Sequence, residues 1–476
     1  MLPPWEKEME SRINAFELKT GQPQKSILLE ADRCRLYGLD FGYLFHGFFR
    51  EGAAFFFLCF YYFVEYTRFQ TIFPQIGFLP YGSLSIALTL LLLPTDRYRK
   101  HPNYLLVFSV YGFIFLTFFS MTYALDSKEA SDRGYVYLNW LIVFFMTVSL
   151  ITNERRFVFF LLLYLLWNFK ISQHGARIWA NRGFGFAGWG ISGPQGWFQN
   201  SGELGLQMAM VCIISCCFFI GIRQYLSGWR RWVILTIPVT SFMSVIASST
   251  RGDYLAMAAG LLWLTLVSKG NRIFIIILVT LALAIGYWAM PPEMLARFQV
   301  AGSEEDYTSM TRETRWKAGF EIFRDHPILG VGTGSWVTYY YTHYPREPGR
   351  EGWGLPHNSF IEVIGEHGGF GLAFLVLIFA GMFILNRQTR AIASHLNDPV
   401  ASWLSRGLDA ATVAFLVGGS FMSVFHYPYV WVHAAMIVGL YTATQRNLAA
   451  PPIKPPPSTP SPQIGEGNQN LPVSPS

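Results

Sequence analysis

The chain has 476 residues, 52% of them hydrophobic and only 14% charged, with a formal net charge of +6. Soluble globular chains carry about 25% charged residues, so this composition excludes an ordinary soluble domain and indicates an integral membrane protein. Excess Lys and Arg in such proteins normally lies in cytoplasmic loops, and we therefore expect no nucleic-acid binding.

Apolar runs separated by charged or glycine-rich breaks predict an all-α polytopic fold in the lipid bilayer. A hydrocarbon core of about 30 Å needs roughly 20 apolar residues per helix, and about twelve such runs occur. Nine lie in residues 37–290 and three in residues 359–448. They centre on residues 50–67, 75–94, 104–125, 135–152, 157–172, 204–222, 232–248, 253–268, 272–290, 359–385, 406–425 and 428–445.

Basic clusters in alternate short loops predict the orientation of the chain. They contain Arg97, Arg99 and Lys100, then Arg155 and Arg156, Arg223, Arg230 and Arg231, Lys269 and Arg272, and Arg387 and Arg390. Positive loops face the cytoplasm. Residues 1–36 are therefore predicted to be a cytoplasmic N-terminal segment, and the Pro-rich residues 449–476 a disordered cytoplasmic tail.

Two long segments are then predicted to be external, namely residues 172–203 and residues 291–358, the latter between the ninth and tenth spans. Long loops are usually either functional or disordered. Tryptophans argue against disorder, because aromatic rings favour the membrane interface and also stack on sugars. These tryptophans are Trp179, Trp189, Trp197, Trp336 and Trp353.

Arg251 lies in the string Ser-Ser-Thr-Arg-Gly-Asp, where one predicted span ends externally and the next begins. A charge so close to the hydrocarbon is costly and is usually kept for a ligand or an ion pair. Asp253 is the alternative partner, in which case Arg251 has only a structural role.

Residues from Thr311 onward begin a predicted amphipathic helix that carries Arg312, Arg315 and Trp316. The two arginines are three residues apart and share one helix face. The planar fork of an arginine suits a phosphate. A solvated surface role is the alternative for each arginine alone.

The glycines of Asp325-His-Pro-Ile-Leu-Gly-Val-Gly-Thr-Gly334 do not form a phosphate-binding P-loop, because no Lys-Ser or Lys-Thr follows them. A tight turn that brings backbone close to the membrane fits the pattern better.

His357 opens the string His-Asn-Ser-Phe-Ile-Glu, where the second long segment re-enters the bilayer. An imidazole is well suited to exchange a proton near neutral pH, although a lone histidine can also be structural. Asn358 and Glu362 lie close by, and no spacing typical of a metal site occurs. We expect neither a metal nor a cofactor.

Taken in order, these motifs resemble the O-antigen ligase and polymerase family of bacterial envelope glycosyltransferases. The resemblance rests on Ser-Ser-Thr-Arg251-Gly, on Arg312 four residues before Trp316, on the glycine motif, on His357-Asn-Ser-Phe-Ile-Glu, and on Glu366-His-Gly-Gly-Phe-Gly. The number of helices and the long external segment extend it over most of the chain.

The resemblance implies a GT-C-like architecture in the bacterial inner membrane and a metal-independent transferase. Such an enzyme moves a glycan from an undecaprenyl-pyrophosphate carrier to a glycan, lipid or protein acceptor at the periplasmic face. It further implies that Arg251 and Arg312, with Arg315 as a rival, engage the donor pyrophosphate, and that His357 is the base. Trp316, Asn358 and Glu362 are expected to support them.

The first external loop, with Gly193-Pro-Gln-Gly-Trp-Phe-Gln-Asn-Ser-Gly-Glu203, departs from the commoner form of the family and most resembles its O-glycosylation ligase branch. The acceptor therefore stays open between lipid A core, protein and exopolysaccharide. Two other functions stay open as well: a polymerase of the same family that joins repeat units, and a non-catalytic transporter of lipid-linked glycan.

Overall fold

The computed structural model describes residues 30–185, 190–268, 307–344 and 354–449, together with residues 273, 276, 277, 280, 281 and 284. Every regular element in these stretches is a helix. A chain in lipid must satisfy its backbone hydrogen bonds internally, which a helix does within one segment. The predicted all-α fold is therefore confirmed for the described part of the chain.

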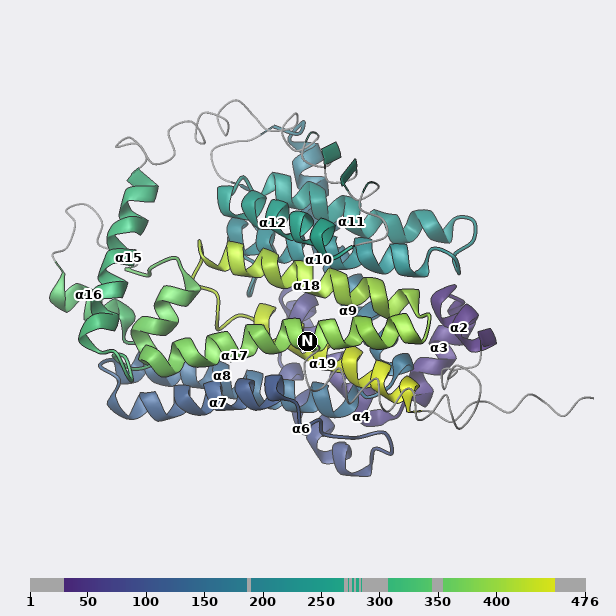
Figure 1. Cartoon of the computed structure of the whole chain (residues 1–476), viewed down its shortest axis with the longest axis horizontal. Helices are drawn as coiled ribbons and strands as arrows, with labels where there is room; N and C mark the ends of the chain where they lie inside the picture. The colour runs from purple at the N-terminus through teal and green to yellow at the C-terminus, as the bar shows by residue number, and fades with distance from the viewer. Residues whose placement is uncertain are drawn as a thin grey trace, which may run out of the picture.

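The helices follow one another in the order of the predicted spans (Figure 1). They are α2 (Glu30–Tyr37), α3 (Phe41–Arg50), α4 (Ala53–Thr67), α5 (Phe69–Ile72), η1 (Pro74–Ile76), α6 (Tyr81–Leu92), η2 (Leu93–Thr95), α7 (Leu105–Ser120), η3 (Met121–Tyr123), α8 (Ser127–Leu150), α9 (Glu154–Asn181), α10 (Ser201–Ile222), α11 (Arg230–Ala247), α12 (Arg251–Val267), α15 (Tyr307–Asp325), α16 (Trp336–His343), α17 (Ser359–His395), α18 (Pro399–Gly419) and α19 (Pro428–Leu448).

Seven described helices are long and apolar enough to cross a membrane, and the bent pair α3 and α4 brings the number to eight. The count of about twelve is thus supported only in part. Helix α4 has 15 residues and α12 has 17, so each is shorter than a typical span. The predicted span 272–290, the N-terminal residues 1–29 and the tail from residue 450 lie outside the described residues, apart from the six single positions.

Several helices extend beyond their predicted ends: α17 continues to His395, ten residues past 385, and α18 begins at Pro399, seven residues before 406. Two more extend into predicted loops. Helix α8 begins at Ser127, eight residues before the predicted span 135–152, and α9 continues to Asn181, into the segment predicted as a loop from residue 172. Both extensions carry charged residues that a search for apolar runs leaves out.

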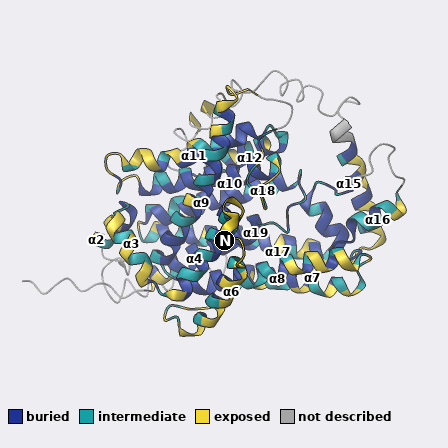
Figure 2. Cartoon of the chain, turned by 180° about the vertical axis from the view of Figure 1, so that it is seen from behind, coloured by how far each residue is buried: buried dark blue, intermediate teal, exposed yellow. Residues whose placement is uncertain are grey.

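Helices α10 and α18 pack against each other at the centre of the bundle, and α9, α11, α12 and α17 surround them. Buried residues concentrate in these central helices, whereas the outer helices expose residues on one side (Figure 2). Helix α7, for example, exposes large apolar side chains, as expected for a surface that faces lipid. These side chains are Leu105, Phe108, Phe115 and Phe119.

Helix α17 links the two ends of the molecule. Its 37 residues would span about 55 Å if they were straight, but the helix is broken at Gly368. Helices α15 and α16 lie at its N-terminal end, and α2 and α3 lie at the opposite end of the bundle (Figure 1). At that far end Asp398 accepts from Arg33 of α2.

Candidate active site

Arg312 and Arg315 both lie close enough to His357 to affect its charge. Burial of the imidazole, then Arg312, then Arg315 lower the pKa of His357 to about 4. Two nearby positive charges and partial desolvation both disfavour the charged imidazolium form. His357 is therefore neutral at physiological pH, which is the form that a general base requires.

The backbone just before His357 is held by side-chain donors from α15 and α16. Each N–H satisfies a carbonyl of residues 354–356, and a single bond of this kind contributes about 1 kcal/mol. The donors are Trp336 Nε1 to Gly354 (2.8 Å), Arg315 Nη1 to Leu355 (3.1 Å) and Trp316 Nε1 to Pro356 (2.9 Å). Trp316 thus positions the chain that carries His357.

His357 has a positive φ of 47°, a left-handed conformation that is uncommon for residues other than glycine. Asn358 follows it as the N-cap of α17, and its Oδ1 accepts from the N–H groups of Phe360 (3.0 Å) and Ile361 (3.1 Å). An asparagine satisfies free N–H groups in this way at many helix starts. Asn358 therefore fixes the start of α17 and, with it, the position of the histidine.

Arg315 is 9% exposed and is bound on one side only. Its Nη1 donates to the backbone, whereas its buried Nε has no hydrogen-bond partner among the described residues. A guanidinium group has five N–H donors in a fixed plane. Arg315 therefore keeps donor capacity for an anion beside His357.

The start of helix α12, which carries Arg251, lies across Phe421 from α15. Arg251 is the first residue of α12 and is half-buried. The next residue, Gly252, packs so closely on Phe421 that an added Cβ would lie 3.0 Å from the Cβ of Phe421. The Phe421 ring lies 6.4 Å from that of Trp316, so Phe421 separates the start of α12 from α15.

Asp253, the alternative partner of Arg251, is fully buried and accepts from the hydroxyl of Ser248 at 2.9 Å. This bond ties the carboxylate to the turn between α11 and α12 and stabilises the backbone that carries Arg251.

The loop of residues 420–427 between α18 and α19 joins the helices around the site. Ser359 donates to the carbonyl of Met422 (2.7 Å), and Tyr427 donates to Glu203 at the start of α10 (2.9 Å). Phe421 in the same loop contacts α12 and α15 as described above. Segments distant in sequence are thus brought together around one loop.

A partly buried charged cluster that the sequence did not predict includes His426 of this loop. Arg133 donates to Nδ1 of His426 (2.6 Å) and to Glu129 (3.0 Å), and it lies 3.4 Å from Oε1 of Glu362. Because an arginine can only donate, Nδ1 of His426 is the acceptor and carries no proton. Burial and then Arg133 lower the pKa of His426 well below its usual value.

Glu362, which the sequence predicts as a supporting residue, lies in a buried position next to Arg133. It is 4% exposed and lies one helical turn after Asn358. Its nearest opposite charge is Arg133 from α8, which connects the start of α17 to α8.

One signal in the sequence could have revealed Arg133. Asp126 caps α8 by accepting from the N–H groups of Lys128 (3.1 Å) and Glu129 (3.0 Å). An Asp followed three residues later by Glu is typical of a helix start, and it would have moved Arg133 from a loop into a helix. No comparable signal exists for His426.

The glycine motif forms the expected tight turn and pairs with the break in α17. Gly330, Gly332 and Gly334 have positive φ angles of 69°, 98° and 71°, which glycine adopts without strain. Backbone hydrogen bonds then join the two motifs. They run from Val331 to Gly365 (3.0 Å), from Gly332 to Glu366 (2.9 Å) and from Gly369 to Pro327 (2.8 Å).

Two tryptophans of the long segments are buried, whereas Trp197 is half-buried and donates to Glu65. Trp336 is 1% exposed, in a small core with Ile322, Val331 and Ile361, and Trp179 is 5% exposed. Neither offers an exposed face to a sugar. Trp189 and Trp353 lie outside the described residues.

Within the described stretches no group of three or more His, Cys, Asp and Glu side chains could hold a metal ion. The metal-independent mechanism is not tested by this finding and stays a prediction.

A bundle of membrane-spanning helices with arginines and a neutral histidine gathered at one end defines an integral membrane protein with a polar site at one surface. Residues 236–376 match the model of the O-antigen ligase family. This match confirms, over that segment, the resemblance drawn from the motifs, and the family is associated with membrane glycan ligases and polymerases. The matched segment contains every candidate residue named from the sequence. No curated protein matches the chain.

Proposed function

We propose that the protein is a glycosyltransferase of the ligase type, which transfers a glycan from undecaprenyl pyrophosphate to an acceptor at the periplasmic face of the inner membrane. The observation that carries the proposal is the proximity of Arg312 and Arg315 to a neutral His357 within the family segment. Arg251, Arg312 and Arg315 bind the diphosphate, and His357 is the base.

The electrostatics of the site suit a diphosphate leaving group. When the bond between the anomeric carbon and the diphosphate oxygen breaks, negative charge develops on that oxygen. Fixed positive groups at a border of low dielectric stabilise such charge without reorganisation. The unpartnered Nε of Arg315 among the described residues supports this role.

The acceptor hydroxyl loses its proton to His357 as its oxygen bonds to the anomeric carbon. Attack from the side opposite the diphosphate inverts the configuration at that carbon. The bound diphosphate also offsets the charge of the arginines and thereby raises the pKa of His357. Donor binding therefore makes the histidine a better base when the proton must move.

The test is transfer by the purified chain reconstituted with lipid-linked glycan and candidate acceptors. His357→Ala should lower transfer by at least about a hundredfold, which is typical of a lost general base. The matched control is His343→Ala, because His343 is exposed on α16. Loss of activity in both variants, or in neither, contradicts the assigned base.

The products of the assay distinguish a ligase from a polymerase. Attachment of full-length glycan to a non-glycan acceptor supports a ligase, whereas longer glycan on the lipid carrier supports a polymerase. Movement of donor across the bilayer without transfer would indicate the transporter.

Metal independence is tested in the same assay. Full transfer in the presence of a chelator is the expected result. Loss that is restored by a divalent ion would contradict this part of the proposal.

A further inference from the structure

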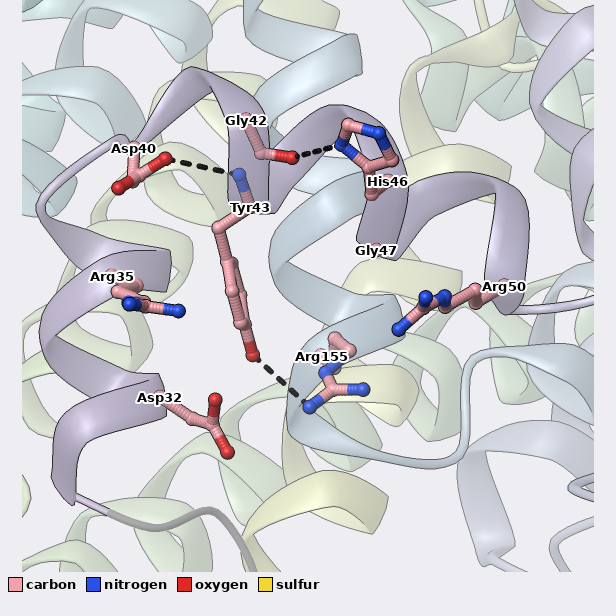
Figure 3. Close-up of a pocket in the computed structure, with 9 residues that line it drawn as sticks. All are labelled: Asp32, Arg35, Asp40, Gly42, Tyr43, His46, Gly47, Arg50 and Arg155. Carbon is pink, nitrogen blue, oxygen red and sulfur yellow. Dashed lines mark hydrogen bonds between the residues drawn. The ribbon is translucent and has the colours of Figure 1, made fainter.

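A polar pocket lies at the end of the molecule opposite the candidate active site. It has a volume of about 520 Å³ and is formed by α2, α3 and the first turn of α9 (Figure 3). Pockets that bind small ligands typically have volumes of about 300–1,000 Å³. The pocket is therefore large enough for a ligand.

Three arginines line this pocket, and Figure 3 shows their guanidinium groups around the side chain of Tyr43. Arg35 and Arg50 have no ion-pair partner among the residues that the structure describes. Arg155 donates to the Tyr43 hydroxyl (3.0 Å) and lies 3.7 Å from Glu51. Its Nε is buried and unpartnered within the same described stretches.

The acidic residues of the lining offset these charges only in part. Asp40 is engaged as the N-cap of α3, where its Oδ1 accepts from the N–H of Tyr43 at 3.0 Å. Asp32 is the other carboxylate of the lining. Glu51 offsets Arg155, whereas Arg35 and Arg50 have no ion-pair partner in the part of the chain that the structure describes, and these two guanidinium groups favour an anionic ligand.

The helix that forms this pocket also exposes an apolar ridge. Phe41, Phe45 and Phe49 recur every fourth residue and are 79%, 53% and 56% exposed. On another side of the helix, Phe48 packs on Phe159, with 5.9 Å between the ring centroids. Helix α3 meets α4 at an angle of 113°, so it lies across the direction of the span that follows.

Helix α3 thus combines an apolar ridge with an adjacent basic pocket to which α2 and α9 contribute, and amphipathic helices with basic and apolar sides typically lie in the membrane interface. The ridge then faces acyl chains, and the adjacent pocket lies at the depth of the headgroups. Anionic headgroups attract each nearby Arg by about 1 kcal/mol.

We propose that this pocket binds the phosphate headgroup of an anionic phospholipid, whose acyl chains lie along Phe41, Phe45 and Phe49. The arginine forks hold the phosphate oxygens, and Tyr43 stays bound to Arg155. The site is separate from the glycan site and does not depend on the transferase assignment.

The experiment counts lipids bound to the full-length chain by native mass spectrometry in detergent, with a phosphatidylglycerol titration. Arg50→Gln should weaken binding about fivefold, and Arg35→Gln combined with Arg50→Gln about twenty-five-fold, from the value of about 1 kcal/mol for each Arg. Arg99→Gln is the control, because Arg99 is exposed near the α8–α9 turn, outside the pocket. It should leave binding unchanged.

Two further measurements identify the ligand. Phosphatidylcholine should bind at least about tenfold more weakly than phosphatidylglycerol if charge selects the lipid, which is about 1.4 kcal/mol. Phe45→Ser should weaken phosphatidylglycerol binding but not that of soluble glycerol phosphate.

Several results would overturn the proposal. Equal losses in Arg50→Gln and Arg99→Gln would mean diffuse attraction instead of a site. Equal binding of both lipids would exclude charge selection. Binding of glycerol phosphate as tight as that of the lipid would indicate a site for a soluble phosphate. If Arg50→Gln fails to fold, Arg35→Gln alone gives the same comparison.

Discussion

His357 combines an uncommon backbone conformation with an unusual charge state. Its φ of 47° arises at the tight entry into α17, whereas its pKa of about 4 is due first to burial and then to Arg312 and Arg315 on α15. Residues in sparsely populated backbone regions cluster at functional sites. Both features agree with a catalytic role, and each can be measured.

The pH dependence of transfer should follow the charge around His357. The acidic limb of kcat/KM reports the free enzyme, so we expect it near pH 4, where the imidazole gains its proton. The limb of kcat should lie at higher pH, because the bound diphosphate offsets the arginines. Arg312→Gln removes a positive neighbour, raises the pKa and should move the kcat/KM limb to higher pH.

Lys317→Gln is the matched control for this profile, because it removes the same charge from an exposed position of α15. An unchanged limb in Arg312→Gln, or an equal shift in both variants, would show that Arg312 does not act on the base.

Replacement of the arginines by lysine separates charge from geometry. Arg251→Lys, Arg312→Lys and Arg315→Lys keep the charge but lose the planar fork. If bidentate contact matters, each should lower kcat/KM at least about tenfold, or about 1.4 kcal/mol. Arg324→Lys, at an exposed position of the same helix, should retain activity. Full activity in all three lysine variants would show that these arginines act through their charge and not through bidentate contact.

At the level of single helices, the break in α17 depends on Gly368. This residue has φ 59° and ψ −147°, a region that essentially only glycine adopts. A Cβ there would also lie 2.6 Å from the carbonyl carbon of Ile328 in the glycine motif. The break therefore requires glycine for two independent reasons.

Gly368→Ala should destabilise the protein by about 2 kcal/mol, in the range of 1–3 kcal/mol for one strained residue. It should also lower transfer, because the start of α17 carries Glu362 and follows His357. Thermal unfolding in detergent measures the first effect. Gly82→Ala is the control, since a Cβ there meets no atom within 4 Å. Equal stability of the two variants would mean that the break tolerates a side chain.

The sequence predicted the positions of apolar helices better than the ends of helices that begin with polar turns. Apolar runs located α7, α10 and α17, because lipid demands long apolar segments. The same criterion placed the start of α8 eight residues too late, because the first turns of that helix are polar. Its first turns contact the 420–427 loop and α17 instead of lipid, so their polarity follows from tertiary contacts.

At the scale of the whole molecule, buried ion pairs connect helices at the end opposite the active site. Arg156 is fully buried and pairs with Asp96 (2.7 Å) and Glu51 (3.2 Å). The sequence presented Arg156 only as part of a basic loop cluster. Its partners are 60 and 105 residues away, so no local pattern could identify them.

The orientation of the bundle is open to a direct test. We expect α15 in the periplasm and α2 in the cytoplasm, since the basic loops lie at the α2 end. In right-side-out spheroplasts, an impermeant maleimide should label the double variant Lys317→Cys with Cys34→Ser. In the unmodified protein, Cys34, which is exposed on α2, should react with the maleimide only after lysis. The reverse pattern would place the candidate active site in the cytosol.

The amino-acid order alone predicted the membrane setting, most of the helices, the family resemblance that residues 236–376 confirm, and the candidate residues, whose roles stay predictions. These properties depend on composition and on short motifs that any one segment contains. The placement of Arg312 and Arg315 beside His357, the Arg133–His426 cluster and the basic pocket at α3 required the folded chain. They arise where helices far apart in sequence pack together, and packing partners leave no periodic signal in either segment.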